Sequence, residues 1–134
     1  MNYADIAAAF RDQIRTAVGP SATVIFENTP PVTPPRPYYK AFLLPGENET
    51  PTFGTDKRVR AVGIYQVNVV VDAGVGDGLA ASLADEIMSA FYRGLTFVAG
   101  AAIITIEKSW RSAGIPSGDH YSIPVSVRYW ADLT

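Results

Sequence analysis

The stretch from Arg58 to Val71 restricts the fold of this chain more than any other segment. One set of alternate positions is apolar and carries Val59, Ala61, Tyr65, Val67, Val69 and Val71. The other set includes Arg60, Gln66 and Asn68. A period of two residues is that of a β-strand with one buried and one accessible face. A strand of this length needs a sheet around it and an apolar layer against its buried face.

Two other segments repeat apolar residues at the spacing of an amphipathic helix. The first is residues 3–18, with Ile6, Phe10 and Ile14 on its apolar side, and Gly19-Pro20 ends it. The second carries Leu79, Leu83, Ile87 and Phe91, flanked by Ala80, Ala84 and Met88. For this helix we predict Asp77 as the N-cap and Gly94 as the glycine after the C-terminus. These two helices supply the apolar layer that the long strand requires.

The remaining apolar stretches are predicted strands: residues 23–26, 38–44, a short one from Thr96, 102–111 and 120–130. Residues 112–119 are predicted as a turn. The last strand alternates, with Tyr121, Ile123, Val125, Val127 and Tyr129 inward and His120, Ser122, Ser126 and Arg128 outward. Pro124 lies on its outward face and cannot donate to a ladder, which indicates an edge position or a bulge. The resulting order is α-β-β-β-α-β-β-β. We therefore expect an α+β fold in one domain, residues 1–134, with a single mixed or antiparallel sheet packed against two helices.

Composition is that of a globular protein: of 134 residues, 48% are hydrophobic and 18% are charged. The formal net charge is −2 and the basic residues are scattered, so we expect no specific nucleic-acid binding. The absence of cysteine excludes a disulfide scaffold and a thiol nucleophile. Charges interrupt the first apolar residues, and no long apolar run follows. We expect no signal peptide and no membrane partner, and a soluble, intracellular protein.

Candidate chemical groups are few. His120 is the single histidine, and no G-x-S-x-G turn is present to hold a nucleophile. The segment Gly74–Ala80 matches neither phosphate-loop pattern, and its Asp77 would repel phosphate. Glu47, Glu49 and Asp56 lack the spacing of a calcium loop. We predict no enzyme activity, no cofactor and no metal site; a small hydrolase using His120 is the weakest hypothesis.

A proline-rich segment, residues 30–37, separates the first two predicted strands. Residues 31–36, PVTPPR, fit the P-x-x-P-x-R pattern of a ligand for an SH3-type groove. A spacer between domains is disfavoured, because the residues before it are too few to form a core. We interpret the segment as a stiff connection that carries the chain across one end of the sheet.

Several of these stretches together resemble a known family. The sequence "YADIAAAFRDQI" leads to "VIFENTP"; "PYYKAFLLPGENETPTFGTD", "RAVGIYQVNVVVDAGVGDGLAASLADEI" and "GDHYSIPVSVRYWAD" follow. The series is similar to the phage tail-terminator-like proteins, which are related to minor tail protein U of lambda-like phages and are often found in prophages. The resemblance implies a structural virion protein without catalytic activity, made in the cytoplasm of a bacterial host. It further implies a ring, typically a hexamer, that caps the tail tube, ends its polymerisation and presents a surface to head–tail joining proteins.

The resemblance assigns no individual residue, so interface candidates come from their positions in the sequence. A polar loop and the strand after it are the best candidates for contacts with other subunits or the tail tube protein, together with an arginine in the proline segment. The candidate residues are Arg36, Glu47, Glu49, Asp56, Lys57, Arg58 and Arg60. The alternative function is a soluble monomeric module that binds a peptide or small ligand on the sheet.

Overall fold

The computed structural model describes residues 3–19, 22–26, 37–46, 59–74, 78–100 and 102–133. The elements are α1 (Tyr3–Val18), β1 (Val24–Ile25), β2 (Tyr38–Pro45), β3 (Val59–Asp72), α2 (Gly78–Ala90), β4 (Thr96–Ala99), β5 (Ala102–Arg111), β6 (Ile115–Ser117) and β7 (His120–Leu133). Within the described residues the strands form one seven-stranded sheet of order β1-β2-β3-β7-β5-β4, and β6 pairs with β7. β1 and β2 are parallel and every other pair is antiparallel, so the sheet is mixed. The predicted fold class is confirmed.

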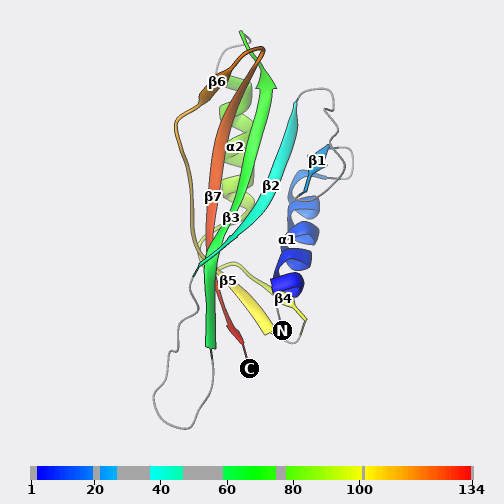
Figure 1. Cartoon of the computed structure of the whole chain (residues 1–134), viewed down its shortest axis with the longest axis vertical. Coiled ribbons are helices and arrows are strands. Elements are labelled where there is room, and N and C mark those ends of the chain that lie inside the picture. Colours follow the sequence, from blue (N-terminus) through cyan, green and yellow to red (C-terminus); the bar gives the residue numbers. More distant parts are fainter. Residues whose placement is uncertain are drawn as a thin grey trace.

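The two long strands β3 and β7 form the centre of the sheet. They pair antiparallel along their whole length, from Val59 opposite Leu133 to Asp72 opposite His120. The apolar positions of both strands are buried on the side that carries the helices (Figure 1). The alternation predicted for residues 58–71 and 120–130 is therefore confirmed.

The helices pack on this inner face around one aromatic cluster. Phe10 of α1 is fully buried and stacks on Tyr65 of β3, with ring centroids 4.4 Å apart and planes 12° apart. Its ring also lies 5.0 Å from Tyr129, 5.1 Å from Phe97 and 6.1 Å from Phe91. Aromatic pairs of this kind contribute about 0.5–1.5 kcal/mol each beyond their burial. Phe10 therefore ties α1 to β3, β4, β7 and the end of α2.

The prediction for the second helix needs two corrections. Leu79 is 46% exposed, whereas Ala80, Ala84 and Ile87 are buried, so the apolar face is rotated away from Leu79. The helix ends at Ala90. Gly94 does have a positive φ of 89°, but its N–H donates to the carbonyl of Ile106 in β5 and not to the helix. Asp77 lies outside the described residues.

The first helix ends as predicted. Gly19 has a φ of 84°, and its N–H donates to the Arg15 carbonyl at 2.9 Å. A left-handed residue of this kind satisfies one of the orphan carbonyls at a helix end.

Residues 112–119, predicted as a turn, contain the short strand β6. The edge position predicted for Pro124 is wrong, because β7 lies between β3 and β5. The carbonyl of Pro124 accepts a hydrogen bond from Ser112 N–H at 2.9 Å, just after β5 ends. The N and C=O of a strand residue point to the same side. The proline nitrogen therefore faces the residues between β5 and β6, on the side away from β3.

The connection between β1 and β2 joins two parallel strands, with Val24 opposite Tyr39. A parallel pair requires a connection that returns along the sheet, and a hairpin cannot supply it. Most of the proline-rich segment lies outside the described residues, so its interpretation as a stiff connection stays a prediction.

Candidate interaction face

Of the seven predicted interface residues, the structure describes Arg60; Arg36, Glu47, Glu49, Asp56, Lys57 and Arg58 lie outside the described residues. Arg60 belongs to β3 and lies on the side of the sheet opposite the helices. Its guanidinium carbon is 4.2 Å from the centroid of the Trp130 ring of β7. A guanidinium in this position is attracted by the negative face of the indole. Arg60 thus marks a face on which cations and aromatic rings come together.

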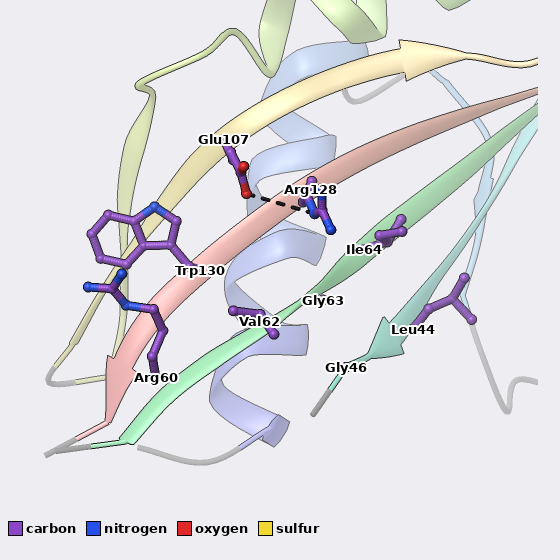
Figure 2. Close-up of a pocket in the computed structure, with 9 residues that line it drawn as sticks. All are labelled: Leu44, Gly46, Arg60, Val62, Gly63, Ile64, Glu107, Arg128 and Trp130. Atoms are coloured by element: carbon purple, nitrogen blue, oxygen red, sulfur yellow. Dashed lines mark ion pairs between the residues drawn. The ribbon is translucent and has the colours of Figure 1, made fainter. Parts of the chain in front are cut away.

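We call this side of the sheet the outer face. Strand register places on it Arg60, Val62 and Ile64 of β3, Arg128 and Trp130 of β7, and Val98, Ile103, Thr105, Glu107, Lys108 and Trp110 of β4 and β5. Leu44 and Gly46 at the end of β2 complete an open groove of about 730 Å³ along it (Figure 2). Within the described part of the chain, both helices pack on the other side, so a sheet face rich in large side chains is left accessible.

A β-bulge in β5 shapes this face. The register between β5 and β7 shifts between Ile106 and Lys108, so that Glu107 is the additional residue. A bulge sets two residues against one on the partner strand. Glu107 and Lys108 accordingly both lie on the outer face against Arg128, and Trp110 follows on the same face opposite Ser126.

Charges beside the bulge are unevenly matched. Arg128 Nε lies 3.8 Å from Glu107 Oε2, and both side chains are about half exposed, at 51% and 52%. Lys108 is the direct cross-strand partner of Arg128, and its Nζ lies 5.2 Å from the Trp110 ring centroid. Like charges opposite one another in a sheet destabilise it by roughly 0.2–1 kcal/mol. Lys108 and Arg128 therefore place positive charge on an accessible surface, and their repulsion lowers the stability of the isolated chain.

The exposed side of α2 has the opposite character. Ser82, Asp85, Glu86 and Ser89 are exposed along it, and the helix contains no basic residue. The negative charge of this helix also acts on a neighbouring strand. Burial raises the pKa of the Tyr39 hydroxyl of β2, and the charge of Glu86 raises that pKa further. The chain thus carries an acidic helix surface and an outer sheet face with basic residues on opposite sides.

His120 lies at the start of β7 on the outer face, as predicted. Its Nδ1 is 3.4 Å from Asp119 Oδ1, and the Asp119 side chain is 79% exposed. Among the residues that the structure describes, no three His, Asp or Glu side chains come together as metal ligands. The segment Gly74–Ala80 falls partly outside the described residues.

The sequence matches the model of a family described as phage tail terminator protein, over residues 5–129. The chain belongs to the phage tail terminator family. The predicted resemblance is thereby confirmed, and membership of this terminator family makes the chain a structural component of a phage virion tail.

Two solved structures share the terminator fold. One, which bears no descriptive name, is 24% identical, with a TM-score of 0.80 over 100% of this chain and 98% of that chain. The other is a chain in "Virion of native gene transfer agent (GTA) particle", 18% identical, with a TM-score of 0.60 over 95% of this chain and 94% of that chain. At these identities the likeness shows the fold alone. No curated protein matches the sequence.

Sequence reasoning missed most of the outer face of this terminator. Alternation along residues 120–130 predicts Arg128 on the outward face, and Trp130 follows the same alternation two positions further along the strand. Trp110 has no such signal, because strict alternation through residues 102–111 groups it with the buried Ile104 and Ile106.

None of the described helices is long and apolar enough to cross a membrane.

Proposed function

We propose that this terminator-family protein assembles as a ring, a hexamer on the tail, that caps the tail tube and ends its polymerisation. The ring would also present a surface to head–tail joining proteins, and would assemble in the cytoplasm of the bacterial host. Family membership over residues 5–129 is the observation that carries this proposal. Such a role needs surface complementarity with other copies and with the tube protein, and no reacting group.

The geometry of the chain supports the proposal. In the described residues β4 is the last strand on its side of the sheet, and Val98 on it is 69% exposed. An open sheet edge and an accessible outer face offer surface to neighbours. A ring is built from head-to-tail contacts, in which two different patches of one subunit meet. The opposite character of the outer face and the α2 surface meets that requirement.

Deletion of the gene, followed by electron microscopy of the tails, tests the proposal. We expect overlong tubes without heads, and normal length after complementation with the wild-type gene. Complementation with His120→Ala should work equally well, because the role uses no catalytic histidine. Tails of normal length in the deletion strain would contradict the proposal.

The alternative is a monomeric module that binds a peptide or small ligand in the groove of the outer face. This alternative predicts normal tails in the deletion strain, and a ligand that raises the melting temperature of a monomer. The two functions are therefore separated by the same strain.

A further inference from the structure

We propose that the outer face of one subunit docks on the exposed surface of α2 of a second copy of this chain. The proposal rests on the proposed ring and goes beyond it, because it states which two surfaces meet. The outer-face patch consists of Lys108, Trp110, Arg128 and Trp130, and the α2 patch consists of Ser82, Asp85, Glu86 and Ser89.

The composition of the outer face is that of an interface centre. Both tryptophans of the chain, Trp110 and Trp130, lie on it, each half-buried and each with a cation near its ring. Tryptophan and arginine are the residue types most enriched among those that dominate binding energy. Val98 and Ile103 are cross-strand partners on the same face and are 69% and 57% exposed. This is apolar surface for a protein partner to cover.

The charge of the outer face selects an acidic partner. Lys108 and Arg128 are direct cross-strand partners, and Glu107 offsets one of the two charges. An incoming carboxylate would relieve the repulsion within the like-charged pair, which gives the contact a driving force that the isolated subunit lacks.

The surface of α2 fits these requirements on a second copy. Asp85 and Glu86 are exposed, and the small side chains of Ala81, Ser82 and Ser89 beside them let bulky indoles approach the helix. The two patches lie on opposite sides of the subunit, one on the bare sheet and the other on the helix layer (Figure 1). A contact between two different patches repeats from subunit to subunit, and it closes into a ring when the rotation allows.

Cysteine cross-linking tests the contact directly, because the natural chain contains no cysteine. One variant carries Ser82→Cys on α2, a second carries Thr105→Cys on β5 opposite Trp130, and a third carries both. Each is treated with a short bis-maleimide, as purified protein and in tails assembled with the variant. We expect no product from either single variant, dimers from a mixture of the two, and from the double variant a ladder that stops at the ring size. The matched control, Thr105→Cys with Ser117→Cys at the exposed strand β6, should give no ladder.

Charge reversal on each of the two patches provides a second test of the contact. Lys108→Glu with Arg128→Glu should lower the cross-linked fraction about tenfold or more, and so should Asp85→Lys with Glu86→Lys. Mixing the two reversed proteins, each with one cysteine, should restore the dimer formed between the reversed faces. Circular dichroism and melting temperature show that each variant is folded.

Several results would overturn the inference. One is cross-linking by Thr105→Cys alone, which means that two outer faces meet each other. Another is the absence of a ladder in solution and on tails. A third is a ladder that does not change in the Lys108→Glu, Arg128→Glu protein, which means that these charges do not carry the contact. A fourth is binding of a DNA duplex that is lost in that protein while no ladder forms, which makes nucleic acid the occupant. A ladder together with normal tails in the deletion strain would instead contradict only the proposed capping role.

Discussion

Replacing Gly63 by alanine tests the packing of the central strand β3 against the ring of Tyr129 on the inner face of the sheet. Gly63 lies on β3 between Pro45 of β2 and Tyr129 of β7. A Cβ at this position would lie 2.8 Å from the Leu44 carbonyl oxygen, 2.8 Å from Tyr129 Oη and 3.1 Å from Tyr129 Cε1. The ring of Tyr129 thus packs over the glycine, and the carbonyl is backbone held in the β2–β3 ladder. Neither neighbour yields without a shift in the sheet.

The expected loss follows from two opposing effects. Overpacking a buried site costs about 1–3 kcal/mol. Alanine also lowers the entropy of the unfolded chain, which returns about 0.4–1 kcal/mol. We therefore expect Gly63→Ala to lower the free energy of unfolding by about 1–2 kcal/mol, a fall of roughly 3–10 °C in melting temperature for a chain of this size.

Urea denaturation of the variant and of a matched control measures this effect. The control is Gly78→Ala at the start of α2, where a Cβ meets no atom within 4 Å; it should be neutral or slightly stabilising. Combining Gly63→Ala with Tyr129→Phe removes one of the two close oxygens, so the loss should be smaller in that background. Equal stability of the Gly63→Ala and Gly78→Ala proteins would refute the packing argument.

Three further outcomes follow from the core, the strand charges and the buried tyrosine. Phe10→Ala should lower the free energy of unfolding by about 3–5 kcal/mol in urea, because it empties the centre of the aromatic cluster, whereas Asp12→Ala on the exposed side of α1 should change it by less than about 0.5 kcal/mol. Lys108→Thr should be more favourable, by roughly 0.2–1 kcal/mol, when Arg128 is present than in an Arg128→Thr background, because only in the first case does it remove a like charge opposite Arg128; equal shifts of the urea midpoint would contradict that repulsion. Burial raises the pKa of Tyr39 above 10.0, so its stabilising contribution is full below that pH and is lost as the pH rises through the folded-state value. Tyr39→Phe should then flatten the alkaline fall in the urea midpoint, and an identical pH profile would count against it.

The elements that could be predicted from the sequence are those with long, regular periods. α1 matches the predicted range because Ile6, Phe10 and Ile14 all face one core and Gly19 stops the helix. β3 has the expected alternation because one of its faces is covered along its length. By contrast, all three residues of β6 are exposed, so the sequence has no alternation of buried and accessible positions that could predict this strand.

The candidate site was harder to predict because its residues lie within regular strands. Sequence reasoning favoured a polar loop, and of the predicted residues only Arg60 falls in the described part of the chain, where it lies on the outer face. The aromatic partner of Arg60 on that face, Trp130, belongs to β7, which is distant in the chain and pairs with β3 only in the folded sheet.

The bulge at Glu107 explains why the outer face has its present chemistry. With strict alternation, Trp110 would point to the same side as the buried Ile106, into a layer already filled by the Phe10 cluster. The additional residue instead turns Ser109 inward, where its Oγ donates to the Met88 carbonyl of α2 at 3.4 Å, and turns Trp110 outward. The bulge thus keeps the Trp110 indole out of a core that it would overpack and places it on the accessible face. It also sets Glu107 beside Arg128. Because the bulge serves both the core and the surface, the packing of α2 and the character of the outer face are coupled through this one position of β5.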